Sequence, residues 1–364
     1  MSPSTISNFG DRKVKALVTG ASGLVGSAIA VHFLRAGHTV RLALRKQEQA
    51  DAWQQQYGSQ FPGQIESFVY KGDIGDEGVF DEAVQGVEVI VHAASPGFLT
   101  AEDGERDILK PAVNGTLSIL KSAKKAASVK SFVYTSSIAA YTSTKDAWTD
   151  NLALRLNDKS WNRVTYEEAA KMPISEAGEI YAASKAAAEQ AAWNFAKQSD
   201  VHFTLASVAP SFTLGRDYTP GVRSLKDLHS TLGMFVAFLW DKEAFPPLSG
   251  KDVFRPDIFV SVDDVARAHV AAALNPSRSN GHRYFLVTAR TGWEQLVRKI
   301  IEVKPELKGH FPAPPKQDPE RTTRYTYEAD GITKDLGVVY SSLDELVKPF
   351  ADQVYELAKA DGAL

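Results

Sequence analysis

Short apolar runs alternate with segments of helical period from Lys15 to about Val208, and this alternation constrains the fold more than any other feature of the chain. The pattern is typical of βαβ units, in which helices join parallel strands and cover both faces of a sheet. The sequence therefore predicts an α/β fold with a doubly wound parallel sheet. We expect six strands, at Lys15–Thr19, Thr39–Leu44, Ile65–Tyr70, Val87–His92, Ser131–Thr135 and His202–Val208. The helices predicted between them include Leu24–Arg35, Val79–Gln85, Ile108–Ala126 and Tyr181–Lys197.

The alternation ends after Pro210, where glycines and prolines separate short pieces rich in aromatic residues. With 364 residues the chain exceeds the usual size of one core, so a smaller second lobe is expected. We predict a nucleotide-binding domain at 12–209, to which 254–290 returns, and a substrate-binding lobe made of 210–253 and 291–364. Residues 257–262 and 283–287 are predicted strands, and 263–274, 291–303 and 343–359 predicted helices. The proline-rich segment 304–322 is predicted to be an extended connection.

Composition and charge exclude several classes of function. The 41 Lys and Arg nearly balance the 44 Asp and Glu without a basic block, which argues against nucleic-acid and membrane-surface partners. Zero cysteines exclude disulfides and thiolate metal sites, and the eight histidines lack helical zinc spacing, so no metal is expected. The longest apolar run, Met234–Trp240, is too short to cross a bilayer. No signal-peptide pattern begins the sequence, so we expect a cytoplasmic protein, with a monomer as the working expectation.

Three glycines stand where the first predicted strand gives way to a helix, at Gly20, Gly23 and Gly26. A pyrophosphate approaches backbone N–H groups at a helix N-terminus closely, so side chains are excluded at Gly20 and Gly23, while Gly26 permits close packing of helix on strand. Leu24 and Val25 complete this loop. The alternative is a tight turn that needs glycine only for its backbone angles. In its strand-to-helix context the motif predicts a Rossmann-type dinucleotide-binding domain.

The residues after the second predicted strand indicate which dinucleotide is bound. A carboxylate usually accepts hydrogen bonds from the ribose of NAD at this point, but here Arg45 and Lys46 follow the strand. Two cations would attract a 2'-phosphate, which favours NADP over NAD. Alternatively these cations form a solvated strand end and Glu48 reaches the ribose. Arg41 is a further cation that could assist.

Tyr181 and Lys185 open a segment of strong helix formers, so the phenol and the ammonium are expected one turn apart on one helix face. A nearby ammonium stabilises the phenolate, so we expect a lowered pKa for Tyr181, which could then serve as a proton donor. The spacing alone is not decisive, because Tyr141 and Tyr355 are also followed four residues later by lysine. Those pairs lie in a polar segment with poor helix propensity and in the terminal helix.

Ser136 and Ser137 follow the fifth predicted strand, at the edge where open α/β sheets bind their ligands. A serine hydroxyl there can hold a substrate oxygen beside Tyr181. The alternative for all these residues is a surface tyrosine, a solvated lysine and strand-end caps.

These motifs together resemble an extended short-chain dehydrogenase/reductase, and within it the fungal NADPH-dependent aldehyde and ketone reductases related to dihydroflavonol reductase. The resemblance covers most of the chain and rests on the glycine loop and on the segments Lys71-Gly72-Asp73-Ile74, His92-Ala93-Ala94-Ser95-Pro96, Asn114-Gly115-Thr116, Thr135-Ser136-Ser137, Ser160-Trp161-Asn162 and Tyr181-Ala182-Ala183-Ser184-Lys185. Among these, Ser160-Trp161-Asn162 is the most discriminating.

The resemblance implies a catalytic Ser137, Tyr181 and Lys185, with Ser136 as the fallback for the serine. It implies cofactor contacts from Asp73, Ile74, Ala93, Ala94, Ser95, Thr135, Tyr181, Lys185, Pro210 and Ser211. The acid of the segment 262–267 is structural by the same resemblance, and the role of Asn114 stays open.

The resulting hypothesis is a reductase that uses NADP(H) to convert a small aldehyde or ketone, apolar or aromatic, into an alcohol. Candidate residues of the substrate pocket are Phe98, Leu99, Phe212, Phe235 and Trp240, with Tyr218 and Leu239 as further candidates. Phe235, Leu239 and Trp240 could equally form the core of the lobe. Two alternatives remain: a nucleotide-sugar epimerase or dehydratase, which keeps NAD bound and which Arg45 disfavours, and a non-catalytic NADP(H)-sensing regulator.

Overall fold

The structure, a computed structural model, describes residues 7–96, 101–143, 154–240, 257–311 and 325–364. Its centre is a seven-stranded sheet in the order β10-β7-β5-β4-β1-β2-β3, in which every neighbouring pair is parallel. The strands are β1 (Lys15–Thr19), β2 (Thr39–Leu44), β3 (Ile65–Val69), β4 (Val89–His92), β5 (Ser131–Thr135), β7 (Thr204–Pro210) and β10 (Arg283–Leu286). The predicted doubly wound Rossmann-type sheet is confirmed, and β10 extends the six strands of 12–209 to seven.

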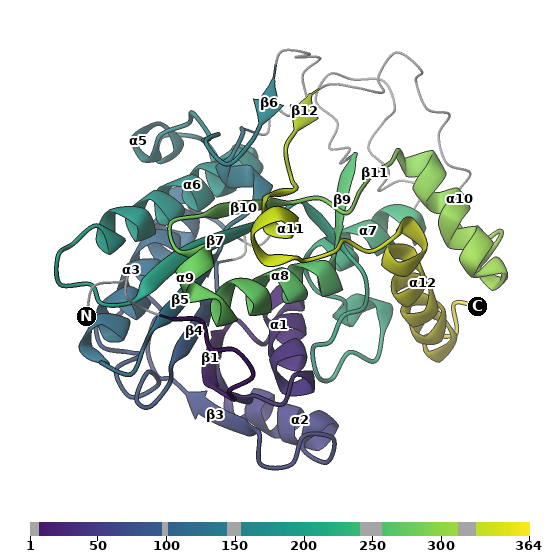
Figure 1. The fold of residues 1–364 in the computed structure, drawn as a ribbon. Helices are drawn as coiled ribbons and strands as arrows, with labels where there is room; N and C mark the ends of the chain where they lie inside the picture. Colours follow the sequence, from purple (N-terminus) through teal and green to yellow (C-terminus); the bar gives the residue numbers. More distant parts are fainter. Residues whose placement is uncertain (1–6, 97–100, 144–153, 241–256, 312–324) are drawn as a thin grey trace.

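Helices cover both faces of the large sheet (Figure 1). One face carries α1 (Leu24–Arg35), α2 (Gln47–Tyr57) and α8 (Val262–Leu274), and the other carries α3 (Lys110–Lys125), which continues a π-helical turn η2 (Glu105–Leu109), and α6 (Ala177–Ala196). Each face has its own apolar core, because residues that alternate along a strand point to opposite sides. Val18 and Val40 face α1, whereas Leu17 and Ile90 face the α3 side.

The predicted helix Val79–Gln85 is wrong. These residues form a series of turns, with hydrogen bonds such as Asp81 N to Gly78 O and Val84 N to Phe80 O. Gly78 and Gly86 bracket the segment with positive φ angles of 81° and 72°, which end any helix on both sides. The apolar residues of the segment are nevertheless buried as predicted for a packed element, since Phe80 and Val84 are fully buried in the core on the α3 side of the sheet.

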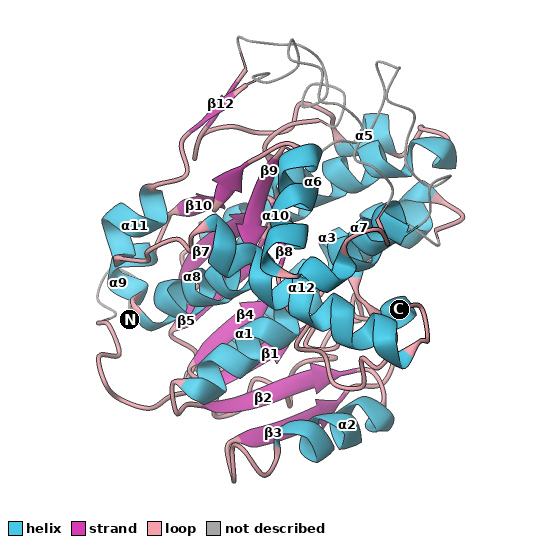
Figure 2. Ribbon diagram, turned by 90° about the vertical axis from the view of Figure 1, so that its right-hand side faces the viewer, coloured by secondary structure: helices cyan, strands magenta, loops and turns pink. Residues whose placement is uncertain are grey.

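A second, smaller sheet lies beyond the carboxyl ends of β7 and β10. A three-stranded sheet has the order β11-β9-β8, with β8 (Phe212–Leu214) directly after β7, β9 (Ile258–Ser261) and β11 (Ala289–Arg290) shortly after β10. Within residues 254–290, α8 and β10 therefore pack with the large sheet while β9 and β11 join the small one. The lobe's longer helices are α7 (Ser230–Trp240), α10 (Trp293–Val303) and α12 (Leu343–Ala360), which in Figure 2 lie together above β1, β2 and β3.

Short elements complete the fold. A two-stranded ribbon pairs β6 (Arg155–Leu156) with β12 (Thr326–Tyr327). Helical segments of three to six residues occur at η3 (Ile138–Ala140), α5 (Tyr166–Ala169), η4 (Ile174–Glu176), η5 (Leu225–Asp227), α9 (Pro276–Ser279), η6 (Pro305–Leu307) and α11 (Gly331–Leu336). The segment 304–322, predicted to be extended, begins with η6, and from residue 312 onward it lies outside the described residues. Among the helices in the described ranges, none has the length and apolarity needed to span a membrane.

Candidate active site

The glycine loop lies against the end of β4. Gly20 has φ of 75°, and a Cβ there would come within 2.7 Å of Ala94 N and 2.8 Å of Ala93 C. A Cβ on Gly26 would stand 2.2 Å from Gly20 O. The protein's own backbone thus excludes a side chain at both positions. At Gly20 the positive φ and the close residues 93–94 exclude it, and at Gly26 the carbonyl of Gly20 does.

Gly23 differs from the other two glycines, because the protein leaves room for a side chain there. Its backbone is extended, with φ of -134°, and a Cβ would meet only Gly20 O at the ordinary distance of 3.7 Å. It is the N-cap of α1, and the first bond of this helix runs from Ser27 N to Gly23 O. The N–H groups of Leu24, Val25 and Gly26 precede that bond and are free of helical partners by geometry, so they form an anion-binding N-terminus without an acid in its first turn.

A hydrogen-bonded bracket holds the segment after β4 against the glycine loop. Thr19 Oγ1 accepts from Ala94 N at 3.2 Å and lies 2.9 Å from His92 Nδ1, so the hydroxyl proton is directed to the histidine. Burial lowers the pKa of His92 to about 3, and its ring is neutral. Ala93 and Ala94 are partly buried and Ser95 is exposed, as residues along a cofactor would be.

The cations after β2 lie at the surface. Arg45 is exposed, with its Nε donating to the Tyr70 hydroxyl at 3.1 Å, and Lys46 is the exposed N-cap residue of α2. Glu48 is exposed in the first turn of that helix. Arg41 cannot assist, because it is held by the Glu66 carboxylate at 2.8 Å and donates to two carbonyls of the 76–86 turns.

The adenine-side candidates lie after β3. Asp73 is exposed, and its carboxylate accepts from Gly75 N at 2.8 Å, which shapes the turn. Ile74 is 5% exposed and packs against α3 at Gly115, where a Cβ would stand 3.2 Å from Ile74 Cγ2. The side chain of Ile74 thus packs in the core. Ile74 could contact a cofactor only through its backbone or through the small exposed part of its side chain.

The two serines after β5 have different environments. Ser136 is buried, and its hydroxyl donates to Glu189 Oε2 at 2.6 Å. Ser137 is partly buried, caps η3 by accepting from Ala139 N, and its hydroxyl hydrogen-bonds with that of Tyr181. The geometry therefore favours Ser137 over Ser136 as the serine of the site.

Lys185 lies one turn after Tyr181 on α6, but its ammonium has another partner. Nζ donates to Thr135 O at 2.9 Å and lies 5.2 Å from the centre of the Tyr134 ring. Burial lowers the pKa of Lys185 to about 8, against the opposing charge of Glu189. Burial likewise raises the pKa of Tyr181, and the hydrogen bond with Ser137 opposes this rise.

The expected electrostatic effect of Lys185 on Tyr181 is therefore not seen in this structure. The expectation considered the helical spacing alone. It left out the desolvation of the phenol and the carbonyl of Thr135, which accepts a hydrogen bond from the ammonium. Ser137 is the residue that stabilises the phenolate here.

The other two tyrosine-lysine pairs lie elsewhere. Tyr141 is 2% exposed and stacks on Phe285 in a core cluster, and Lys145 falls outside the described residues. Tyr355 lies on α12 with the ammonium groups of Lys304 and Lys359 near its ring. The Tyr141 ring lies against the guanidinium of Arg283, at 4.1 Å from its centre, and Tyr355 belongs to the terminal helix α12.

Thr135, Pro210 and Ser211 end the two strands that flank the site. The side chain of Thr135 points to the α8 face, 2.9 Å from His269 Nε2, so only its backbone faces Lys185. Pro210 is the last residue of β7, and Ser211 joins it to β8. The Ser211 hydroxyl is buried without a hydrogen-bond partner in the structure, which suits a site that a polar ligand completes.

The candidate pocket residues divide into three groups. Phe98 and Leu99 lie outside the described residues, and for Leu239 and Trp240 the structure describes only the backbone of α7. Phe235 is fully buried edge-on against Phe350 of α12, at 5.3 Å between ring centres, so it belongs to the lobe's core.

Phe212 and Tyr218 are also packed within the protein. Phe212 is 7% exposed and packs edge-on against Phe259 of β9. Tyr218 donates to Asp263 on α8 at 2.8 Å and also faces α1. Phe212, Tyr218 and Phe235 all belong to one buried apolar cluster, and their role as pocket walls stays a prediction.

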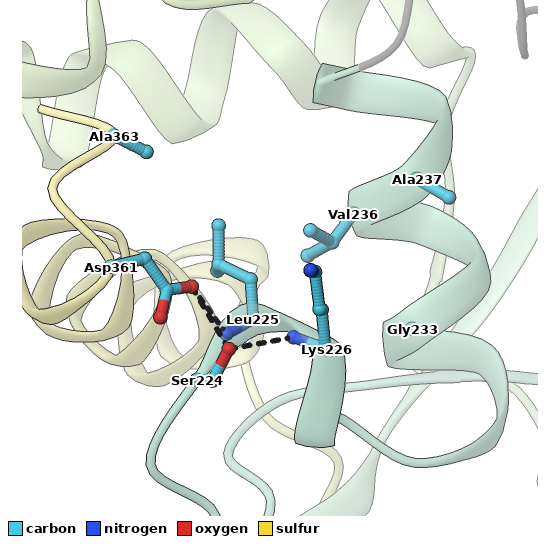
Figure 3. A pocket seen from close by; sticks show the side chains of 8 residues that line it. All are labelled: Ser224, Leu225, Lys226, Gly233, Val236, Ala237, Asp361 and Ala363. Carbon is cyan, nitrogen blue, oxygen red and sulfur yellow. Dashed lines mark hydrogen bonds between the residues drawn. The ribbon is translucent and has the colours of Figure 1, made fainter.

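A cavity of about 650 Å³ lies between η5, α7 and the residues that follow α12 (Figure 3). It is lined by Ser224, Leu225, Lys226, Gly233, Val236, Ala237, Asp361 and Ala363. The Asp361 carboxylate closes one side by accepting from Ser224 Oγ and Leu225 N. None of the candidate catalytic residues lines it, so it is separate from the site at the sheet edge.

Sequence reasoning missed two charged residues that support the site. Glu189 continues the face of Tyr181 and Lys185 on α6, and Arg283 of β10 forms a buried ion pair with it at 2.7 Å. The spacing 181, 185, 189 on an alanine-rich helix was a usable signal for Glu189. Nothing in the sequence indicated Arg283. No cluster of metal-ligating side chains occurs within the described ranges.

The fold is that of a Rossmann-type nucleotide-binding protein, with a glycine loop and hydroxyl groups at the carboxyl edge of its parallel sheet. The sequence pattern of the "NAD dependent epimerase/dehydratase family" matches residues 16–287. The chain belongs to this family, and the resemblance to extended short-chain dehydrogenases/reductases is confirmed.

Relatives with assigned activities align along nearly the whole chain. "Aldehyde reductase 2" of Sporidiobolus salmonicolor is 30% identical over 91% of this chain and 93% of its own length. The NADPH-dependent methylglyoxal reductase of Saccharomyces cerevisiae is 30% identical over 93% and 97%. The crystal structure of yeast methylglyoxal/isovaleraldehyde reductase complexed with NADPH superimposes with a TM-score of 0.80 at 28% identity, covering 96% of this chain and all of that one, 100%.

Proposed function

We propose that this protein is an NADPH-dependent reductase that converts an aldehyde or ketone into an alcohol. The observation that carries the proposal is the hydrogen bond between the Ser137 and Tyr181 hydroxyl groups, with Ser137 two residues past β5 and Tyr181 one helical turn before Lys185. Two hydroxyl groups held together at the ligand-binding edge of the sheet can both reach one carbonyl oxygen. The relatives described as aldehyde and methylglyoxal reductases support the same chemistry.

The chain's own residues divide the work as follows. NADPH, when bound, would supply a hydride for the carbonyl carbon. Tyr181 gives its phenolic proton to the carbonyl oxygen, and Ser137 orients that oxygen by a hydrogen bond. Lys185 lies one turn from Tyr181 and would bind the nicotinamide ribose. The glycine loop and the N-terminus of α1 would hold the pyrophosphate, with Ala93 and Ala94 as further contacts.

The residues present fit this cofactor. The room at Gly23, the N–H groups of α1 and the unpartnered Ser211 hydroxyl lie at the carboxyl ends of β1 and β7. Arg45 and Lys46 offer exposed cations after β2, where a 2'-phosphate would be bound. Apolar or aromatic carbonyl compounds are the proposed substrates, and cytoplasmic location and a monomeric state stay predictions.

The direct test is consumption of NADPH with a panel of aldehydes and ketones, with NADH as the control. We expect the NADPH absorbance band to decay and alcohol to form in equal amount, faster than with NADH. An epimerase or a cofactor sensor would consume no NADPH with any carbonyl compound of the panel, and that result would reject the proposal.

Arg45 is predicted to carry the preference for NADPH. Removing its charge by Arg45→Ala deletes one charge-assisted contact with the 2'-phosphate, so the Kd for NADPH should rise roughly tenfold or more while that for NADH stays unchanged. Titration of the fluorescence of each bound cofactor measures both values. An equal weakening of both cofactors would instead assign Arg45 a structural role through its bond with Tyr70.

A further inference from the structure

The carboxylate of Glu189 is the most densely bonded buried group in the described part of α6. Its side chain is fully buried, and Arg283 reaches both oxygens, with Nε 2.7 Å from Oε1 and Nη2 3.1 Å from Oε2. Ser136 donates to Oε2 at 2.6 Å, and Ser207 donates to Oε1 at 2.6 Å. Trp193 adds a fifth bond at 3.2 Å, so the buried charge is satisfied on all sides.

These bonds connect the elements on which the site is built. Glu189 lies one turn after Lys185 on α6, Ser136 directly follows β5, Ser207 is in β7 and Arg283 is in β10. The backbone ladder between β5 and β7 ends with the bond from Ser136 N to Val208 O. After that backbone bond, the hydrogen bond from the Ser136 hydroxyl to Glu189 is the next contact that fixes the chain before Ser137.

The other side of Arg283 binds the segment Ser160-Trp161-Asn162. The guanidinium lies 3.7 Å from the centre of the Trp161 ring and donates to Asp158 O and Ser160 O, both at 2.7 Å. Asn162 in turn binds the η3 turn that Ser137 caps, donating from its backbone to Ala140 O at 2.8 Å and from its side chain to Ala139 O at 3.0 Å. The segment thus links Arg283 to the residues that follow Ser137.

We propose that Glu189 is a positioning residue for the reaction: through Ser136 on one side and through Arg283 and the 160–162 segment on the other, it holds the Ser137 hydroxyl against Tyr181. Stability alone gives little reason for this arrangement, because apolar residues of similar volume often replace a buried ion pair without loss. A carboxylate at this place binds Arg283 through both of its oxygens and Ser136 through one of them, which no apolar residue could do. The inference rests on the proposed reductase activity for its kinetic readout.

Two buried serines offer a matched test. Ser136→Ala and Ser207→Ala each delete one hydroxyl bonded to Glu189 at 2.6 Å, but only Ser136 adjoins Ser137. We expect Ser136→Ala to lower kcat roughly tenfold or more with little change in the carbonyl KM, because a small displacement of a catalytic group costs rate rather than binding. Ser207→Ala should keep kcat near that of the unaltered protein, and thermal midpoints should show similar stability for the two variants.

A second readout does not depend on turnover. With meta-fluorotyrosine incorporated, the fluorine resonance of Tyr181 is assigned by its disappearance in Tyr181→Phe, and it reports the bond with Ser137. We expect Ser136→Ala to shift this resonance and Ser207→Ala to leave it in place. Glu189→Gln, which removes the charge and keeps the shape, is the second variant and should move both readouts in the direction of Ser136→Ala.

Equal effects of the two serine variants, or an unchanged resonance in Ser136→Ala, would overturn the positioning role. If the unaltered protein turns over no carbonyl compound, the proposed function fails, yet the fluorine resonance still decides whether Glu189 positions Ser137.

Discussion

Tyr181→Phe is expected to lose nearly all NADPH-dependent carbonyl reduction, by roughly 10²- to 10⁴-fold in kcat, the usual contribution of a positioned proton donor. The substitution deletes only the phenolic oxygen, which hydrogen-bonds with Ser137. The ring and the helix around it are retained, so the glycine loop is undisturbed. The Kd for NADPH should therefore stay within about twofold, a change below ~0.5 kcal/mol. Steady-state kinetics and cofactor fluorescence measure the two quantities on the same preparation.

Tyr355→Phe is the matched control for this prediction. Tyr355 also precedes a lysine by four residues on a helix, α12, but its ring lies with Lys304 and Lys359 away from the sheet edge. Its substitution should leave turnover unchanged. Full activity in Tyr181→Phe, or an equal loss in Tyr355→Phe, would remove Tyr181 from the mechanism.

The electrostatics around Tyr181 show what sequence spacing can and cannot predict. Spacing placed Tyr181 and Lys185 correctly on one face of α6, because a helix repeats every 3.6 residues. It could not show that the ammonium donates to Thr135 O, since that carbonyl lies 50 residues away in the chain. Nor could it weigh the desolvation of the phenol against the hydrogen bond from Ser137.

The same distinction holds for the fold. The bounds of β1, β2, β5 and α1 were predicted to the residue, because local hydrophobic period and glycine punctuation define them. The turns at 76–86 were mistaken for a helix, since buried Phe80 and Val84 have a helical spacing whether or not a helix forms. Phe235 has a similar ambiguity: its apolar spacing on α7 fits a pocket wall or a core, and the sequence could not show its contact with Phe350.

Contacts between residues far apart in the chain could not be predicted from the sequence. Arg283 and Glu189 are 94 residues apart, and their contact depends on β10 lying next to β7 at the edge of the sheet. The segment Ser160-Trp161-Asn162 stood out in the sequence without a structural reason. The reason is the stacking of Trp161 on the guanidinium of Arg283.

Gly23→Ala is the variant that separates cofactor binding from folding. The backbone of Gly23 is extended, and the new Cβ would lie 3.7 Å from Gly20 O, so the unliganded protein should fold with an unchanged thermal midpoint. The methyl group would stand where a pyrophosphate must approach the N-terminus of α1. A steric conflict of this size costs about 2–3 kcal/mol, so we expect the Kd for NADPH to rise roughly 30- to 140-fold.

Alanine substitutions of two other glycines serve as controls for this prediction. Gly178→Ala, in the first turn of α6 with no atom within 4 Å of the new Cβ, should keep NADPH affinity and stabilise the protein by up to about 1 kcal/mol. Gly26→Ala, whose Cβ would stand 2.2 Å from Gly20 O, should lower the thermal midpoint and the cofactor affinity together. Cofactor titration measures the NADPH affinity of all three variants, and thermal unfolding measures their stability. If Gly23→Ala binds NADPH as tightly as Gly178→Ala does, the pyrophosphate does not lie at this loop, and the proposed cofactor site would have to move.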